Sequence, residues 1–255
     1  MKVSFIGAGN VATHLAKACA SNGIQIKEIY SRSIENANSL ADQCNAQSIN
    51  KLEQLSTDID FIILSVSDNA LPEISSNLNR INVPVVHTSG STSIVVLKSE
   101  HHSYGVLYPL QTFSKNKVVN IAEVPFFLET SSDELNSTLL KFCSMLGANA
   151  NQADSNQRMN LHIAAVFACN FSNHMYAIAE ELMQKNKLDF ELLKPLIQET
   201  ALKIQSLSPK SAQTGPASRK DSTTIDKHLA ALQSEKRLFE LYKAISEDIA
   251  KNQNS

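Results

Sequence analysis

The first twelve residues constrain the fold more than any other part of the chain. The apolar run 1–6 breaks into Gly7-Ala8-Gly9-Asn10-Val11-Ala12, which has the spacing of the dinucleotide-binding fingerprint. There the first glycine makes a tight turn, the second admits a pyrophosphate, and the third small residue lets a helix pack on the strand. Residues 11–20 continue as an amphipathic stretch whose N-terminal amides attract a diphosphate. We therefore predict a strand, a phosphate-binding turn and a helix, with cofactor contacts at Gly7, Ala8, Gly9, Asn10 and Val11.

The end of the second predicted strand indicates which dinucleotide binds. Residues 24–30 alternate as a strand and lead into Ser31-Arg32-Ser33. An NAD site usually has an acidic residue at this distance from the glycines, where it binds the ribose hydroxyls. An arginine between two hydroxyls is instead suited to a 2′-phosphate. A solvated surface arginine would explain the same residues, but after the fingerprint we favour NADP, with Ser31, Arg32 and Ser33 as contacts.

The remainder of the first half alternates between strands and helices, which is typical of a parallel, doubly wound sheet. Apolar runs predict strands at residues 60–66, 83–87, 104–108 and 125–129, followed by a helix at 133–146. Polar residues follow two of these strands, at the carboxyl edge where such sheets bind ligands. We expect further cofactor contacts there, at Val66, Ser67, Asp68, Ser89 and Gly90.

The pattern changes after about residue 150. Residues 155–185 contain no Gly or Pro and predict one helix of about 45 Å, long enough to run between domains or through a subunit interface. Further helices are predicted at 190–207, 221–232 and 235–251. The fold class is thus α/β, with a doubly wound, mostly parallel, Rossmann-like sheet followed by an all-helical domain. We place the domains at 1–150 and 151–255 and expect a homodimer through the helical half.

Catalytic candidates lie in the helical half. Arg158, His162, Asn170, Asn173 and His174 are polar residues within an apolar helix. On a regular helix His162, Asn170 and Asn173 share a face, which would suit a proton donor and an orienting amide beside a cleft. Interhelical hydrogen bonds or exposure to solvent would explain them equally well.

The segment 214–221 is a second candidate, because it combines a rigid turn with Arg219, which could bind a substrate carboxylate. An ordinary connection between helices is the alternative. His101 and His102 lack carboxylate or cysteine partners nearby, so we expect no metal site.

Composition excludes several classes of partner. The formal net charge is −2 and no basic tract occurs, which argues against nucleic acid and anionic membranes. The four cysteines are scattered, as in a reduced, cytoplasmic protein. Residues 2–20 imitate a signal peptide, but Gly7, Gly9 and His14 interrupt the apolar stretch. We therefore expect a cytoplasmic protein with a small-molecule substrate.

Taken together, the motifs produce a family resemblance. The fingerprint, Ser31-Arg32-Ser33, the His87–Ser91 and Tyr108–Phe113 segments, residues 162–170 and residues 214–228 occur in this order. The chain resembles an uncharacterised bacterial family that joins a Rossmann-like NADP-binding domain to a helical C-terminal domain of unknown function. It is more distantly similar to pyrroline-5-carboxylate reductases and deazaflavin-dependent NADP reductases. The family often has His where this chain has Tyr108, and Gly where it has Lys220.

The resemblance implies an NADP-binding fold. We expect an NADP-dependent oxidoreductase that transfers a hydride between NADPH and a small carbonyl or imine. His162 is the expected proton donor, Asn170 orients the substrate and Arg219 binds its carboxylate. Two alternatives stay open: a non-catalytic NADP-binding protein for redox sensing or scaffolding, and a structural dimer with a degenerate nucleotide site.

Overall fold

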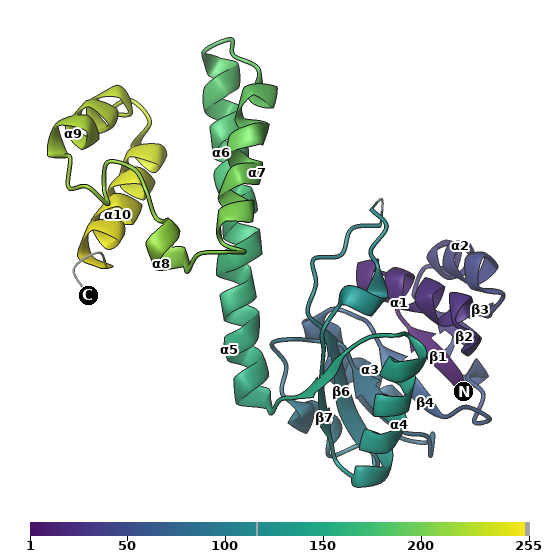
Figure 1. Ribbon diagram of the computed structural model, residues 1–255. Coiled ribbons are helices and arrows are strands. Elements are labelled where there is room, and N and C mark those ends of the chain that lie inside the picture. The colour runs from purple at the N-terminus through teal and green to yellow at the C-terminus, as the bar shows by residue number, and fades with distance from the viewer. Residues whose placement is uncertain (116, 253–255) are drawn as a thin grey trace. The chain divides into compact units, whose positions relative to one another are not determined.

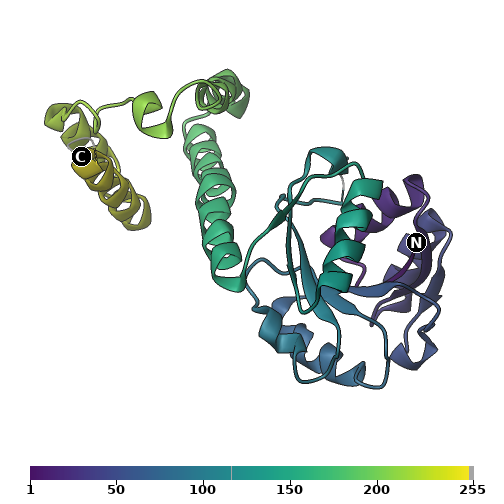
Figure 2. The ribbon, with the colours of Figure 1, turned by 60° about the horizontal axis from the view of Figure 1, so that its bottom comes forward.

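The computed structural model describes residues 1–115 and 117–252, and the chain divides into two compact units. The first spans Met1–Met175 and the second Tyr176–Ser255. The first unit holds a sheet with helices on both of its faces, and the second is helical (Figures 1 and 2). The predicted fold class is therefore confirmed. The division into domains at residue 150 stays a prediction; the last strand ends close to that position, at Gln152.

Within residues 1–115 and 117–252, eight strands form one sheet in the order β3-β2-β1-β4-β5-β6-β7-β8. Among the strands that the structure describes, β6 and β7 pair antiparallel and the other neighbouring strands are parallel, so the sheet is mostly parallel, as predicted. The strand order reverses between β1 and β4, which is where such sheets bind ligands. The strands are β1 (Lys2–Ile6), β2 (Gln25–Tyr30), β3 (Gln47–Ile49), β4 (Phe61–Leu64), β5 (Val85–His87), β6 (Tyr104–Pro109), β7 (Phe126–Thr130) and β8 (Ala150–Gln152).

Alternating strand residues supply two hydrophobic cores, one on each face of the sheet. In β1, Val3 and Phe5 pack into the core beneath α1, α2 and α4, whereas Ile6 packs into the core beneath α3. Four of these elements, α2, α3, β3 and β8, were not predicted from the sequence. The helices are α1 (Asn10–Ser21), α2 (Ile34–Cys44), α3 (Leu71–Asn77) and α4 (Asp133–Met145).

The predicted long helix is present from Ser155 to Lys185, but it contains a π segment. Asp154 caps its start through a capping box with Gln157. It consists of α5 (Ser155–Ala165), the π-helical η5 (Val166–Phe171) and α6 (Ser172–Lys185). A π turn accommodates one extra residue, which rotates the following side chains by about 100°. The shared face predicted for His162, Asn170 and Asn173 assumed a regular α-helix, so the π segment changes the angles between these side chains.

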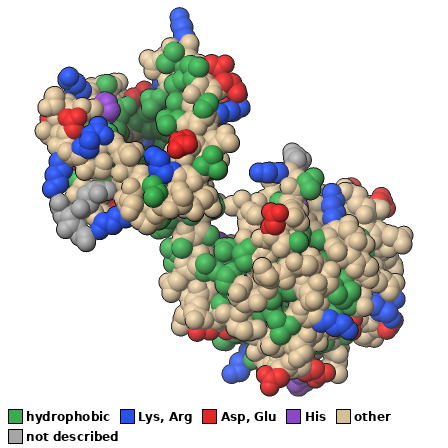
Figure 3. All heavy atoms as spheres, viewed as in Figure 1, with side chains coloured by type: hydrophobic (Ala, Val, Ile, Leu, Met, Phe, Trp, Pro, Cys, Tyr) green, Lys and Arg blue, Asp and Glu red, His purple; other side chains and the backbone are tan. Residues whose placement is uncertain are grey.

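The second unit buries few apolar side chains. Beyond the end of α6 it contains η6 (Phe190–Leu193), α7 (Lys194–Lys203), α8 (Pro209–Ala212), α9 (Ser222–Ala231) and α10 (Lys236–Asn252), close to the three helices predicted there. Among its described residues, the buried hydrophobic side chains are Ala217 and Leu238. Many large ones are exposed, as the green surface in Figure 3 shows. Within the described ranges, no helix is long and apolar enough to cross a bilayer.

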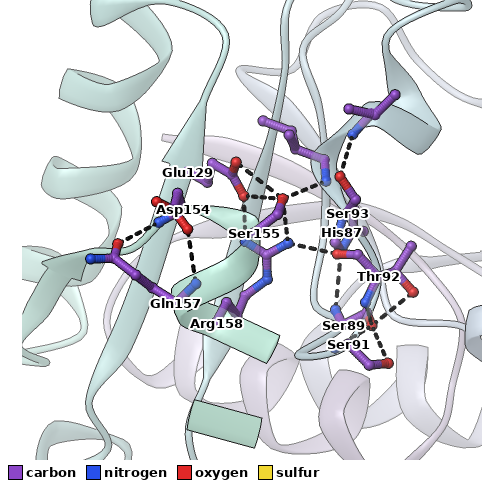
Figure 4. Close-up of polar contacts among 12 residues, drawn as sticks. His87, Ser89, Ser91, Thr92, Ser93, Glu129, Asp154, Ser155, Gln157 and Arg158 are labelled. Carbon is purple, nitrogen blue, oxygen red and sulfur yellow. Dashed lines mark hydrogen bonds and ion pairs between the residues drawn. The ribbon is translucent and has the colours of Figure 1, made fainter. Parts of the chain in front are cut away.

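A buried arginine fixes the start of α5 to the sheet (Figure 4). Arg158 is 1% exposed and forms an ion pair with Glu129 in β7. It also donates to the carbonyl of Thr92 at 2.6 Å. Ser155 adds a hydrogen bond to Glu129 at 2.8 Å. The strand β7, the turn that contains Thr92 and the first turn of α5 therefore hold one another in place.

Replacing Glu129 by Ala should destabilise the N-terminal unit by about 3 kcal/mol, because it leaves the Arg158 charge buried without a counterion. Hydrogen–deuterium exchange of the β6 and β7 amides in mild denaturant measures this effect. Glu191→Ala, which breaks the exposed pair with Lys194, is the matched control and should change the exchange little. Equal effects of the two substitutions would contradict the role given to the buried pair.

Candidate functional site

The fingerprint turn closely approaches the neighbouring strand. Gly7 has a φ of +116°, and a Cβ at this position would lie 2.3 Å from the carbonyl oxygen of Ser65, just after β4. Only glycine can therefore occupy this position. At Gly9, the N-cap of α1, a Cβ would meet nothing within 4 Å, so the backbone there is open to a ligand. The N-terminus of α1 is thus placed for an anion at the switch point of the sheet.

A cavity of about 440 Å³ extends from this turn. It reaches the ends of β2 and β4 and extends along α3 from Glu73 to Asn77, as expected for an extended nucleotide lying across the carboxyl edge. Seven of the residues predicted to bind the cofactor line it together: Gly7, Ala8, Gly9, Ser31, Arg32, Val66 and Ser67.

Arg32 lines this cavity with a guanidinium group that has no described partner within the protein. Its side chain is exposed, and it makes no ion pair or hydrogen bond within residues 1–115 and 117–252. Ser33, by contrast, is used to cap α2: its hydroxyl accepts from the Asn36 amide and donates to Glu35. A free cation at the end of β2, with no acidic residue in the Ser31–Ser33 segment, fits a 2′-phosphate.

A second cation at this cavity was not predicted from the sequence. Lys115 lines the same cavity, although it is far from the fingerprint in sequence. The side-chain amide of Asn10 donates to the Phe113 carbonyl at 3.0 Å, and His14 Nε2 donates to the Ser114 carbonyl at 2.9 Å. These contacts hold the segment that carries Lys115 against α1. The side chain of Asn10 is therefore engaged by the protein, and Val11 packs against the core.

The turn after β5 is built from hydroxyl hydrogen bonds. Ser89 Oγ accepts from the backbone amides of Ser91 and Thr92, at 3.2 and 2.9 Å. The Ser91 hydroxyl donates to Asp68, and the Thr88 hydroxyl donates to Ser65 Oγ at 3.3 Å. The ends of β4 and β5 are thereby joined into one edge beside the cavity. Asp68 and Ser89, predicted as cofactor contacts, also take part in these bonds within the protein.

His87 lies directly beneath this turn and is wholly buried. Its Nδ1 accepts from the Ser89 amide at 3.2 Å. Burial, together with the nearby Arg158 charge, lowers the pKa of His87 to about 4. At neutral pH the ring is therefore uncharged and supports the turn as a hydrogen-bond acceptor.

The structure brings His162 to the same edge. Its Nδ1 lies 3.3 Å from the Tyr108 hydroxyl, and the two rings meet edge to face at 6.2 Å. The Ser89–Thr92 turn packs directly against both side chains, because a Cβ at Gly90 would lie 2.7 Å from Tyr108 and 2.9 Å from His162. The predicted residues His162 and Gly90 are thus close together. The contribution of Tyr108 was not predicted.

The other two catalytic candidates lie elsewhere in the chain. Asn170 is exposed within the π segment η5. Arg219 is exposed in the second unit, in the turn that precedes α9, and Asp221 caps that helix. Their catalytic roles stay predictions.

Comparisons with known proteins agree with this architecture. Residues 2–88 match the family described as NADP oxidoreductase, coenzyme F420-dependent, and residues 124–249 match a domain of unknown function, DUF2520. A comparison with curated proteins finds no match. A crystal structure from Bacteroides fragilis, assigned as an NADP oxidoreductase, is 42% identical, covers 98% of each chain and has a TM-score of 0.91.

More distant solved structures share the fold. A pyrroline-5-carboxylate reductase from Coxiella burnetii is 16% identical, covers 98% of this chain and 97% of its own, and has a TM-score of 0.62. An imine reductase from Myxococcus stipitatus, in complex with NADP+, is 15% identical, covers 98% and 93%, and has a TM-score of 0.68.

These matches confirm the resemblance read from the motifs. The full-length likeness to the Bacteroides fragilis protein decides the assignment, because both the NADP oxidoreductase domain and the helical domain are included in it. The chain therefore belongs to the family that joins an NADP oxidoreductase domain of the coenzyme F420-dependent type to a DUF2520 domain.

Proposed function

We propose that this protein is a reductase that transfers a hydride from NADPH to a small carbonyl or imine compound. The observation that carries the proposal is the position of His162 at the carboxyl edge of the sheet, beside Gly90 and Tyr108. The hydrogen bond from the Thr88 hydroxyl to Ser65 links the segment that precedes Gly90 to a residue that lines the cavity at the fingerprint. A proton donor and a dinucleotide site therefore share one edge.

The residues at the cavity fit NADPH. Gly7 and Gly9 leave room for a pyrophosphate at the N-terminus of α1, and the uncommitted Arg32 supplies a charge for the 2′-phosphate. Lys115 adds a second positive charge to the same cavity. Ser65 and Val66, which directly follow β4, also line this cavity.

When bound, NADPH would supply a hydride, and a new C–H bond would form on the substrate as the nicotinamide is oxidised. The substrate oxygen or nitrogen then needs a proton. In our proposal a protonated His162 gives it from Nε2, is left neutral, and regains a proton from water. Asn170 and Arg219 are the proposed groups for orienting the substrate and binding a carboxylate on it.

A homodimer through the helical half is the second part of the proposal. Two buried hydrophobic residues give the described part of the second unit very little core. Large side chains such as Leu192 and Leu196 are 67% and 64% exposed there. A second copy of the chain, with the same apolar helices, is the partner that we propose covers them. Such a protein needs no membrane or nucleic-acid partner, and we expect it to function in the cytoplasm.

NADPH should bind more than tenfold tighter than NADH, a preference of at least ~1.4 kcal/mol. Arg32→Ala should remove most of this preference by weakening NADPH binding while leaving NADH nearly unchanged. Isothermal titration calorimetry with both nucleotides measures the effect. Arg80→Ala, which removes another exposed guanidinium, is the control and should bind as the unaltered protein does. Equal affinities of the unaltered protein for both nucleotides would refute the assignment of Arg32.

His162→Ala should lower turnover by roughly 100-fold while NADPH affinity barely changes, because the proton donor is lost but no cofactor contact is. NADPH oxidation, measured with a panel of cyclic imines and small aldehydes and ketones, identifies a substrate first and then compares the variants. His102→Ala removes an exposed histidine and serves as the control. If no member of the panel supports turnover while NADPH binds tightly, a non-catalytic NADP-binding role replaces the reductase.

The protein should be a dimer at micromolar concentration in physiological salt. Leu196→Glu places a charge on the apolar surface of α7 and should shift the equilibrium toward monomer, as measured by sedimentation velocity. Val95→Glu is the matched control, since Val95 is 62% exposed but lies in the N-terminal unit. A monomeric unaltered protein would rule out the dimer.

A further inference from the structure

We propose that Tyr108 is a positioning residue that fixes the ring of His162, with Nδ1 held by the tyrosine hydroxyl and Nε2 directed to the substrate. This inference rests on the proposed function, because it assigns the atom of His162 that delivers the proton. It concerns a residue whose role neither the motifs nor the family assignment indicates.

Tyr108 lies where it can fix the orientation of the His162 ring. Tyr108 is the penultimate residue of β6, at the same carboxyl edge as the end of β5, because these two strands are parallel. Its side chain is 8% exposed and packs beside Phe127 of β7, with ring centroids 6.5 Å apart. The hydroxyl is therefore carried by a rigid strand rather than by a loop, and its position 3.3 Å from His162 Nδ1 is defined by the core.

Three elements contact the pair and limit its movement. Strand β6 carries Tyr108, helix α5 carries His162, and the backbone at Gly90 lies against both. A methyl group at Gly90 would overlap the tyrosine ring at 2.7 Å, so the two side chains have no free space on that side. A flip of the imidazole ring that turned Nδ1 away from the tyrosine would lose the hydrogen bond between Nδ1 and the tyrosine hydroxyl.

A hydroxyl suits both protonation states of the histidine. Burial raises the pKa of Tyr108 and outweighs the opposing effect of Arg158, so the phenol keeps its proton at neutral pH. It can donate to Nδ1 of a neutral ring or accept from Nδ1–H of a charged one. A carboxylate could only accept. Tyr108 therefore maintains the ring orientation before and after His162 releases its proton.

The other ring nitrogen remains available. Among the residues that the structure describes, none forms a hydrogen bond with His162 Nε2, and the side chain is half-buried rather than enclosed. Nε2 is consequently the atom that can meet a carbonyl or imine group. The distinction has a chemical consequence, since only the nitrogen that faces the substrate can act as the donor.

Tyr108→Phe tests the inference, because it removes the hydroxyl and keeps the ring that packs against Gly90. In protein labelled with 15N-histidine, the Nδ1 resonance of His162 should move in Tyr108→Phe. The signal is assigned by its absence in His162→Ala. In the same variant kcat should fall about tenfold, which corresponds to ~1.4 kcal/mol, with KM unchanged because Tyr108 does not touch the substrate. Tyr104→Phe, which removes a hydroxyl from the same strand, is the matched control and should leave both readouts unchanged.

An unchanged Nδ1 resonance in Tyr108→Phe would overturn the pairing itself. A shifted resonance with unchanged kcat, in an enzyme that His162→Ala inactivates, would overturn the positioning role. If His162→Ala keeps full turnover, the proton-donor assignment of the proposed function fails, and the positioning role fails with it. The NMR result then still reports separately whether the hydroxyl and Nδ1 are paired.

Discussion

The buried guanidinium of Arg158 is the interaction on which the site depends. A charge that is 1% exposed must be compensated within the protein, and Glu129 and the Thr92 carbonyl supply the compensation. Strand β7, the turn after β5 and the start of α5 thus have fixed relative positions. His162 lies one helical turn beyond Arg158, so its place at the edge of the sheet follows from the same buried pair.

Close backbone packing adds a second constraint, at two glycines. At Gly7 the turn after β1 touches the backbone after β4, and at Gly90 the turn after β5 touches Tyr108 and His162. Neither position has room for a Cβ, yet they serve different purposes. Gly7 allows a ligand to reach the N-terminus of α1, whereas Gly90 allows two side chains from distant parts of the chain to meet.

The sequence predicted those features of the fold that depend on residues close together in the chain. The fingerprint and the long helix each depend on residues within one or two elements, and the fold class followed from them. Pairs such as Tyr108 and His162 are 54 residues apart and meet only through tertiary packing. The π segment was also not predicted, because its residues favour a helix but do not indicate whether a turn of that helix is α or π. Likewise Asn10, Ser33 and Asp68 have sequence positions typical of cofactor contacts, but the structure shows their side chains bonded within the protein.

Exposed apolar side chains on the helix that carries His162 relate the proposed dimer to the proposed proton donation. On the helix that carries His162, the side chains of Ile163, Phe167 and Phe171 are 46%, 64% and 48% exposed. A partner that covers them would also exclude water from the neighbourhood of the Tyr108–His162 pair. In a drier site, a hydrogen bond between a developing charge and an oriented N–H is stronger than in bulk water. If the helix that carries His162 forms part of the dimer interface, the hydrogen bond from His162 to the substrate would become stronger only in the dimer. We therefore expect dimer formation and turnover to depend on each other.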